Sequence, residues 1–332
     1  LVQTSSRPEH GDYQANGVMA AAKRAQRNPR EVAAEVIEVL DLKGIASSVD
    51  VAGPGFLNIT LAADFLAGVD AGHITASPSP QRVVVDYSAP NLAKEMHVGH
   101  LRSTIIGDCI VRVLEAQGHT VLRQNHVGDW GTQFGMLLTY LQDNEANSDS
   151  LAYLEDFYRA AKARFDEDED FQQRARQAVV ALQAGDAHAL EMWQHFITVS
   201  MSHCQDIYNR LDVTLDATHI QGESAYNEAL PGVIHQLKDK GLLTESDGAQ
   251  CVFLDEFKTK KGEILPVIVQ KSDGGYLYAT TDLAAVAYRN NELRADRVLY
   301  FTDARQALHF KQIFAVARAA GFADSAISLE HM

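Results

Sequence analysis

Cysteine is scarce in this sequence, with three residues in 332. Cys109, Cys204 and Cys251 form no Cys-x-x-Cys pair and lie in apolar or helical surroundings, which argues against a disulfide framework and against a protein-bound zinc ion. Long apolar runs are also missing. No stretch approaches the roughly 20 residues that cross a bilayer, and no basic-then-apolar export signal begins the chain. The sequence therefore predicts a cytoplasmic protein with no membrane partner.

Positive charge is in short supply, because 29 lysines and arginines stand against 44 aspartates and glutamates, for a formal net charge of −15. Such a chain repels a polyanion at long range, so a nucleic-acid partner must be held by a local basic surface. The acidic run at residues 166–170 lacks metal-ligand spacing, and we interpret it as a solvated helix face or loop. With 46% hydrophobic residues, the chain is long enough for two or three domains.

The most informative stretch is residues 88–100, Ser-Ala-Pro-Asn-Leu-Ala-Lys-Glu-Met-His-Val-Gly-His. It follows an apolar run at residues 83–87 and precedes a helical pattern, which indicates a strand, a phosphate-binding turn and a helix N-terminus. His97 and His100 can donate hydrogen bonds to phosphate oxygens, and Gly99 presents no Cβ to a nucleotide. On spacing alone, a helix-capping histidine beside a core histidine would be favoured. The flanking strand and helix favour a nucleotide site instead.

A Ser- and Pro-rich stretch at residues 76–80 is a plausible linker between two parts of the chain. Before it, the patterns predict two helices, with Asn28 as the N-cap of the second, and two strands; the ranges are 17–27, 29–40, 49–51 and 56–60. After it, strands and helices alternate, which predicts a parallel sheet covered by helices. The strands are expected at residues 83–87, 121–126 and 297–302, and the helices at 99–117, from 132, and from 306 to Gly321.

Two insertions interrupt this alternation. Long helical patterns cover residues 151–183 and 186–211, and short apolar segments at residues 251–254, 264–269 and 276–278 predict hairpin strands. Active sites of parallel sheets lie at the carboxyl ends of the strands, where residues 88–100 and 126–131 are both expected. The predicted fold class is α/β, with a small α/β domain preceding the parallel sheet.

The segments at residues 10–17, 88–108, 125–135 and 276–282 together resemble the class I aminoacyl-tRNA synthetases, and most closely the bacterial arginyl-tRNA synthetases. The resemblance implies an N-terminal domain at residues 1–78, incomplete at its start, that contacts the tRNA elbow. It implies a Rossmann-type catalytic domain at residues 81–332. The parts of that domain are residues 81–142 and 281–332 as the two Rossmann halves, the second incomplete, residues 143–222 as a helical insertion, and residues 223–280 as a β-containing connective insertion.

We expect this chain to be a piece of a longer protein, because it begins at Leu1 and stops at Met332 without a helix stop or tail. By resemblance, the second class I motif, a Lys-Met-Ser-Lys-Ser-type loop, and the anticodon-binding domain would lie beyond Met332. Some members of the family lack that motif and depend on a lysine before the first motif, which is Lys94 here.

Activation of a carboxylate by ATP needs no covalent nucleophile. It needs the carboxylate aligned with the α-phosphorus and the charge of the transition state stabilised. Lys94, His97 and His100 supply positive or donor groups, and the dipole of the following helix adds to them. The resemblance implies that these three residues are catalytic and that they hold ATP together with Gly99.

Selection of arginine requires a planar fork of acceptors, because bidentate geometry distinguishes a guanidinium from an ammonium group. By resemblance, Asp86 and Asp282 are the matching carboxylates. The other implied arginine contacts are Ser88 and Asn91 at the α-amino and carboxylate groups, His100 at the amino acid, Tyr278 as an aromatic wall and Gln306 as a polar contact. His126, Asp129 and Trp130 are expected to shape the pocket.

Three of these residues have structural alternatives at about even odds before the motif context is considered. Asp86 could close a strand, Asp282 could cap a helix that starts at Leu283, and Gln306 could be a helix-start residue. The shared motifs favour the functional interpretation.

The resemblance implies that the complete protein forms arginyl-adenylate from ATP, Mg²⁺ and L-arginine, and then esterifies the 3′-terminal adenosine of arginine tRNA, as a monomer. Because synthetases of this type generally need tRNA for activation, little activity is expected of this chain alone. Two alternatives remain. One is a nucleotidyltransferase of the His-x-Gly-His type, and the other is a non-catalytic paralogue that binds arginine or tRNA.

Overall fold

The computed structural model describes residues 2–69, 74–92, 94–144, 151–259 and 261–332. The chain forms two compact units, residues 1–75 and residues 76–332. Each unit has a hydrophobic core of its own.

The first unit is an antiparallel sheet with helices packed against it. Its strand order is β1-β2-β4-β3, with β1 (Val2–Thr4), β2 (Tyr13–Ala15), β3 (Ala46–Ala52) and β4 (Phe56–Leu61). The helices are α1 (Gly17–Ala25), α2 (Pro29–Val39) and α3 (Ala63–Gly68), beside a single turn, η1 (Pro8–His10). The side chain of Asn28 accepts a hydrogen bond from the N–H of Arg30 and Pro29 opens α2, which confirms the predicted cap.

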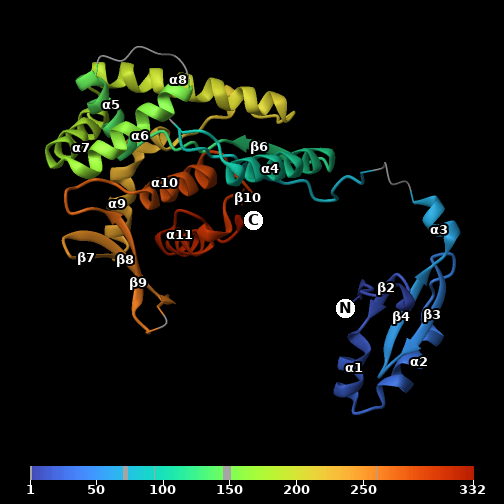
Figure 1. Ribbon diagram of the computed structural model, residues 1–332. Coiled ribbons are helices and arrows are strands. Elements are labelled where there is room, and N and C mark those ends of the chain that lie inside the picture. Colours follow the sequence, from blue (N-terminus) through green and yellow to red (C-terminus); the bar gives the residue numbers. More distant parts are fainter. Residues whose placement is uncertain (1, 70–73, 93, 145–150, 260) are drawn as a thin grey trace. The chain divides into compact units, whose positions relative to one another are not determined.

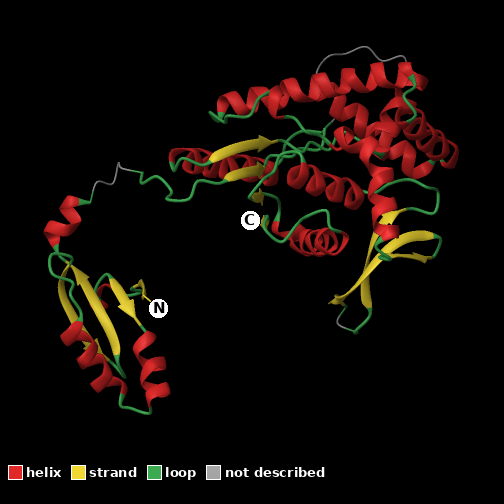
Figure 2. Cartoon of the chain, turned by 180° about the vertical axis from the view of Figure 1, so that it is seen from behind, coloured by secondary structure: helices red, strands yellow, loops and turns green. Residues whose placement is uncertain are grey.

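The second unit is built on a parallel sheet of order β11-β10-β5-β6 (Figures 1 and 2). Its strands are β5 (Arg82–Asp86), β6 (Thr120–Gln124), β10 (Arg297–Tyr300) and β11 (Ser328–His331). The helices α4 (Val98–Ala116), α10 (Tyr278–Asn291) and α11 (Ala307–Ala320) pack on it. Gly321 ends α11 in the left-handed conformation, with φ +79°, as predicted.

Strand β5 is buried on both faces, so its alternate residues enter two different cores. Val84 packs in the core that contains α10 and α11, whereas Val83 and Val85 pack in the core that contains α4. Helix α4 crosses the end of β5 so closely that a Cβ at Gly107 would lie 2.4 Å from the Cβ of Tyr87. This approach brings the N-terminus of α4 to the carboxyl end of β5.

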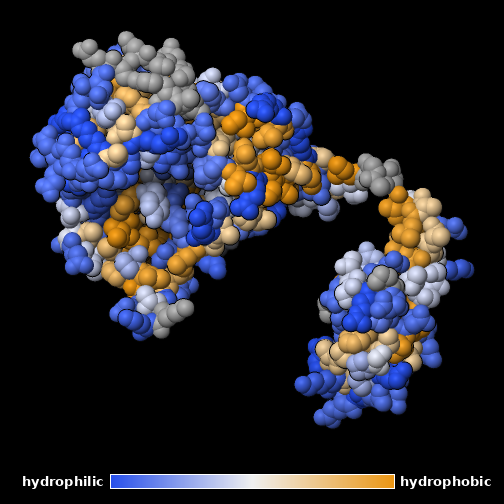
Figure 3. All heavy atoms as spheres, viewed as in Figure 1, coloured by the Kyte–Doolittle hydropathy of each residue, from blue (hydrophilic) through white to orange (hydrophobic). Residues whose placement is uncertain are grey.

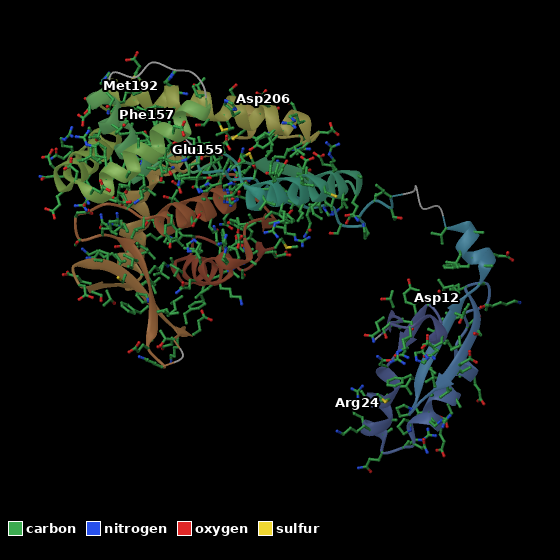
Figure 4. The ribbon with its side chains drawn as sticks, viewed as in Figure 1. Asp12, Arg24, Glu155, Phe157, Met192 and Asp206 are labelled. Atoms are coloured by element: carbon green, nitrogen blue, oxygen red, sulfur yellow. The ribbon has the colours of Figure 1, made fainter. Side chains whose placement is uncertain are left out.

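Four helices pack together, namely α5 (Thr132–Asn144), α6 (Leu151–Glu167), α7 (Glu169–Gln183) and α8 (Ala187–Arg210), and the last three lie where the helical insertion is expected. Their core includes Leu92, which precedes the histidine pair in the sequence, as well as Phe157 of α6, which is labelled in Figure 4. The predicted helix at residues 151–183 is divided at Asp168, whose side chain caps α7 by accepting from the N–H of Phe171. The acidic run at residues 166–170 therefore lies at a helix junction.

The β insertion follows the short helices η2 (Ala217–His219) and η3 (Glu223–Ala229) and helix α9 (Leu230–Asp239). It is an antiparallel sheet of β7 (Leu243–Ser246), β8 (Ala249–Lys258) and β9 (Ile264–Gln270). The strand predicted at residues 276–278 is wrong. Tyr276 makes only an isolated bridge to Gln270, and α10 already begins at Tyr278. The β-branched threonines at residues 280 and 281 have a low helix propensity, so the sequence pattern did not indicate a helix start here. Packing on β9 stabilises it.

Apolar side chains remain at the surface along α4, where Figure 3 shows them gathered. Val98, Ile105 and Ile106 are 69%, 48% and 52% exposed. Among the described residues, no helix combines the length and the apolar character that a membrane span requires.

Candidate active site

The turn after β5 has an unusual backbone, because Ser88 and Ala89 both adopt positive φ, +73° and +44°. Residues that carry a Cβ rarely enter this left-handed region, so the surrounding structure must hold the turn in place. The N–H of Ser88 donates to Oγ of Ser103 at 3.2 Å, and the N–H of Ala89 donates to Oδ1 of Asn125 at 3.0 Å.

The hydroxyl of Ser88 points inward from this turn. Its Oγ lies 2.7 Å from the phenol oxygen of Tyr208 and 2.8 Å from Oγ1 of Thr104, and the residue is 2% exposed. A role for Ser88 at a ligand is therefore expected to run through the backbone of the turn. Asn91, three residues on, is exposed and pairs with Gly128, where a Cβ would lie 2.6 Å from its Oδ1.

His97 and His100 form a stacked pair at the N-terminus of α4, with ring centroids 3.8 Å apart. His97 is the N-cap. Its Nδ1 accepts from the N–H of Gly99 at 3.0 Å, while Nδ1 of His100 accepts from the N–H of His97 at 3.3 Å. A neutral imidazole whose Nδ1 accepts must carry its proton on Nε2. Each ring therefore has one Nε2–H that does not take part in the cap.

The charge state of His100 follows from its surroundings. Burial lowers its pKa to about 4, with further lowering by His97 and by the ammonium group of Lys94. His100 is therefore a neutral hydrogen-bond donor at physiological pH. Lys94 itself lies over the ring of Tyr158 in α6, with Nζ 4.5 Å from the ring centroid.

The structure gives a local steric reason for a glycine at position 99, in addition to the predicted approach of a nucleotide. A Cβ at this position would lie 2.8 Å from Cε1 of His97, so any side chain would displace the capping ring. The capping-histidine alternative and the donor role are therefore compatible here, because the cap uses Nδ1 and leaves Nε2–H.

Asp282 lies inside the first part of α10, so the alternative in which it caps a helix from Leu283 is wrong. Nε2 of His309 lies 2.6 Å from Oδ2 of Asp282, and Nε2 of His126 lies 3.9 Å from Oδ1. Tyr278, one turn earlier and 61% exposed, meets the ring of His309 edge-on at 4.9 Å between centroids. These side chains form one cluster at the start of α10.

Two further carboxylates belong to this cluster, and the sequence predicted only one of them. Burial, together with the carboxylates of Asp129 and Asp282, raises the pKa of Glu223 to about 8. Burial also raises the pKa of Asp129, although its oxygens accept from the N–H and the hydroxyl of Ser224 at 2.9 and 2.6 Å. Crowded acids of this kind favour an incoming cation.

A cavity of about 680 Å³ opens beside this cluster, a size suited to a small ligand. Its lining includes Trp130, Glu223, Tyr278 and Thr281. It lies between the start of α10 and the helical insertion. Gln306 is exposed at the start of α11, and its side chain does not cap that helix.

Asp86 has an internal partner that the sequence analysis did not find. Its Oδ2 accepts from Nη2 of Arg289 at 2.6 Å, and Nε of Arg289 donates to Oε1 of Gln124 at 2.6 Å. Oδ1 of Asp86 and Nη1 of Arg289 have no hydrogen-bond partner among the described residues. Arg289 is completely buried. Burial is the largest influence and opposes its charge, but Asp86, Tyr300 and Tyr226 together outweigh burial and raise the pKa of the guanidinium.

Asp86 and Asp282 both act electrostatically on the same buried ring. Burial raises the pKa of Tyr300 to about 12, and both carboxylates contribute to the increase. Arg289 stacks on this ring, with Cζ 4.9 Å from the centroid. The helical spacing was a usable signal, because Tyr278, Asp282 and Arg289 repeat at four and seven residues along one face of α10.

Comparison with known proteins shows which family has this sequence and fold. A family model described as tRNA synthetases class I (R), catalytic domain, matches residues 65–332, and one described as arginyl tRNA synthetase N terminal domain matches residues 1–61. The chain is 58% identical to an arginine–tRNA ligase of Hahella chejuensis and 55% identical to one of Chromobacterium violaceum. Each match covers 100% of this chain and 60% of the relative.

Two solved structures have the same fold. The arginyl-tRNA synthetase of Plasmodium falciparum matches with a TM-score of 0.82 and 32% identity, over 100% of this chain and 60% of that protein. The arginyl-tRNA synthetase of Thermus thermophilus matches with a TM-score of 0.72 over 99% of this chain and 61% of that one, and at 20% identity it supports the fold alone.

The parallel sheet with a histidine pair at the helix after its first strand defines a class I aminoacyl-tRNA synthetase catalytic domain. Within that class, the chain belongs to the arginyl-tRNA synthetase family. It spans about 60% of the length of the curated relatives that it matches.

Proposed function

We propose that the complete protein activates L-arginine with ATP and transfers the arginyl group to the 3′-terminal adenosine of arginine tRNA. The observation that supports this most directly is that two kinds of surface occur within one unit. Neutral imidazole donors lie at the start of α4, and a cluster of carboxylates lies at the start of α10. The first suits phosphate oxygens and the second suits a guanidinium group.

In the first step, an oxygen of the arginine carboxylate bonds to the α-phosphorus of ATP, and the bond to the bridging oxygen breaks so that pyrophosphate leaves. The free Nε2–H groups of His97 and His100 donate to the phosphate oxygens as negative charge develops. Lys94 supplies the positive charge beside them, and Gly99 keeps the capping ring in place. Mg²⁺ enters with the phosphates of ATP.

In the second step, a ribose hydroxyl of the terminal adenosine attacks the arginyl carbonyl carbon. The bond to the phosphate oxygen breaks, AMP leaves and the proton of the hydroxyl passes to solvent. No side chain is bonded to the substrate in either step. The chain therefore acts by alignment and by stabilisation of charge.

Arginine selection is assigned to Asp282 and Glu223, with Tyr278 as the aromatic wall of the cavity. Asp86 contributes through Oδ1, since Oδ2 is held by Arg289. A buried acceptor without a partner is costly, which supports a donor from the ligand at that atom. Ser88 and Asn91 serve the α-amino and carboxylate groups through the turn, His100 lies between them and the nucleotide, and Gln306 is the outermost contact.

For the domains, we propose that residues 1–78 contact the tRNA elbow and that residues 81–332 carry the chemistry, with the helical insertion at 143–222, the connective insertion at 223–280 and the second Rossmann half at 281–332. The complete protein works in this proposal as a cytoplasmic monomer. The observed division into units at residues 75 and 76 supports such a domain arrangement.

The function is tested first by calorimetric titration of this chain with arginine and with lysine. We expect arginine to bind at least tenfold more tightly, because an ammonium group cannot donate the bidentate pair of hydrogen bonds that a guanidinium group offers to carboxylates. Equal affinity for the two amino acids would contradict the assignment of the pocket.

The reaction is tested on the complete protein by exchange of labelled pyrophosphate into ATP, with and without arginine and tRNA. Exchange that needs both arginine and tRNA supports the proposal. Exchange that needs neither, but needs a small phosphorylated acceptor, would indicate a nucleotidyltransferase. Arginine binding without any exchange would indicate the non-catalytic paralogue.

A further inference from the structure

The left-handed turn at Ser88 and Ala89 is held partly by a helix that is distant in the sequence. The hydroxyl of Tyr208, near the end of α8 in the helical insertion, lies 2.7 Å from Oγ of Ser88. The same oxygen accepts from Nδ2 of Asn125 at 3.0 Å, and Oδ1 of Asn125 accepts from the N–H of Ala89. Tyr208 therefore contacts one residue of the turn directly and the other through Asn125. Figure 4 labels Asp206 on the same helix, two residues before Tyr208.

These hydrogen bonds form one continuous chain. The hydroxyl of Thr104 lies 2.7 Å from the carbonyl oxygen of His100 and 2.8 Å from Oγ of Ser88, and both oxygens can accept its proton. Oγ of Ser88 lies 2.7 Å from the hydroxyl of Tyr208, where either oxygen can be the donor. The hydrogen-bonded chain therefore runs from Asn125 through Tyr208, Ser88 and Thr104 to the peptide of His100.

All members of this chain are buried, with Tyr208 at 1%, Ser88 at 2%, and Asn125 and Thr104 at 0% exposure. Burial raises the pKa of Tyr208 well above its usual value, so the phenol keeps its proton. Linked hydrogen bonds in a medium of low dielectric strengthen one another. Loss of one hydroxyl therefore affects the strained turn and the peptide of His100 together.

We propose that Tyr208 is a positioning residue for the amino-acid site, because it anchors this chain and thereby fixes the Ser88–Ala89 turn relative to His100. The inference rests on the proposed function, since it assigns the turn to arginine. It makes the helical insertion part of the site through one phenol group. The phenol touches no reacting atom and acts only through the turn.

The test compares Y208F with T139V in this chain. Y208F removes only the hydroxyl and keeps the ring in the core. T139V removes another buried hydroxyl, which donates to the carbonyl of Gly135 within α5 and is not part of the hydrogen-bonded chain that contains Tyr208. We expect Y208F to weaken arginine binding about tenfold or more by calorimetry, as loss of one partner in a buried network does. T139V should stay within twofold of the wild type.

A second measurement reports the turn without any ligand. The ¹³Cα and ¹³Cβ resonances of Ser88 and Ala89 should have left-handed values in the wild type and in T139V, and should shift toward extended values in Y208F. Unchanged resonances together with arginine affinity within twofold of wild type would overturn the inference. Equal losses of affinity in Y208F and T139V would also overturn it, because they would indicate a general loss of packing.

If Y208F does not fold, T104V breaks the same chain at its last hydroxyl with little change of shape. T104V should weaken arginine binding comparably, and arginine affinity unchanged from the wild type would contradict the proposal. If both variants fold, the double variant should lose less affinity than the product of the single losses, because one chain cannot be broken twice. If the wild-type chain binds no arginine, the proposed arginine site is refuted, and with it the assignment of the turn to arginine. The resonances would still report whether Tyr208 holds the turn.

Discussion

At the start of α4, the hydrogen-bonding surface comes from one short segment, with His97, Gly99 and His100 in a single helical turn. Along α10, the titratable groups come from five segments that are distant in the sequence. They are Asp86 at the end of β5, Asp129 after β6, Glu223 in η3, Asp282 in α10 and His309 in α11. The first surface is made of neutral donors held by backbone groups, and the second is made of carboxylates held by other side chains.

This difference determines what holds each region in place. The histidine pair needs only the local geometry of a helix N-terminus, which any similar segment can form. The carboxylates need compensating cations, because a buried negative charge without a partner is strongly unfavourable. Arg289 provides that charge for Asp86, and Nε2 of His309 lies at hydrogen-bond distance from Asp282. Substitutions in the acidic region should therefore change stability and ligand affinity far more than substitutions near the histidine pair.

The largest effect is expected from Arg289→Met. Removal of this buried cation leaves Asp86 without its partner, and breaking a buried pair costs about 3–5 kcal/mol. The free energy of unfolding, measured by urea titration, should fall by that amount. Arg297→Met is the matched control, because Arg297 makes two short bonds to Glu330 at a site that is about one-third exposed. That control should lose less than about 1 kcal/mol. Equal losses would contradict the special role of burial.

The next effect is expected from Asp282→Asn on arginine affinity. Loss of a charged acceptor at a largely buried pair costs about 2–5 kcal/mol of binding. Titration calorimetry should therefore show a loss well above tenfold, and a loss below about 1.4 kcal/mol would count against the assignment. Asp239→Asn is the control, since Asp239 also pairs with a histidine, His235, at 2.9 Å, but on the exposed surface. Its arginine affinity should match the wild type.

The sequence was sufficient to predict the parallel sheet and the position of the histidine pair at the start of α4. Strand β5 is a continuous apolar run, and the spacing of His97, Gly99 and His100 lies within one helical turn, so local patterns carry both. The sequence could not show that Arg289 neutralises Asp86, because 203 residues separate them. Nor could it show that Glu223 belongs with Asp282, since only the packing of η3 on α10 brings them together.

The failed strand at residues 276–278 has the same origin. Tyr-Leu-Tyr, followed by an alanine and two threonines, has the composition of a strand, and propensity alone favours that choice. The start of α10 is instead decided by contacts with β9, including a short hydrogen bond from Thr280 to the carbonyl of Val269. That boundary placed Asp282 inside the helix and on one face with Arg289, about 10 Å apart along the axis by helical rise. Neither relation was visible without the tertiary contacts.

A smaller effect is expected from pH, through Glu223. Its pKa of about 8 means that the free site holds a proton at pH 7, and an incoming guanidinium favours the ionised form. Arginine binding should therefore release a proton, and affinity should rise with pH up to about 8 and then level off. The slope cannot exceed tenfold per pH unit for one group.

Glu223→Gln should remove this slope between pH 6 and 8, as measured by titration calorimetry in buffers of different ionisation enthalpy. Glu228→Gln, an exposed position in the same short helix, should keep the wild-type slope. Because the α-amino group of arginine titrates in all of these proteins, only the difference between the two variants is attributed to Glu223. An identical slope in Glu223→Gln would remove this residue from the arginine site.

The smallest effect is expected at the nucleotide end, from the contact of Lys94 with Tyr158. The ring holds the ammonium group where it also acts on His100, so Tyr158→Leu should let Lys94 leave that position. A cation–π contact that is not fully desolvated is worth about 0.5–1 kcal/mol, so ATP affinity should fall roughly two- to fivefold. Tyr158→Phe keeps the face of the ring and should stay within twofold. In a Lys94→Met background, Tyr158→Leu should have no further effect, and a full additional loss there would show that Tyr158 acts on something other than Lys94.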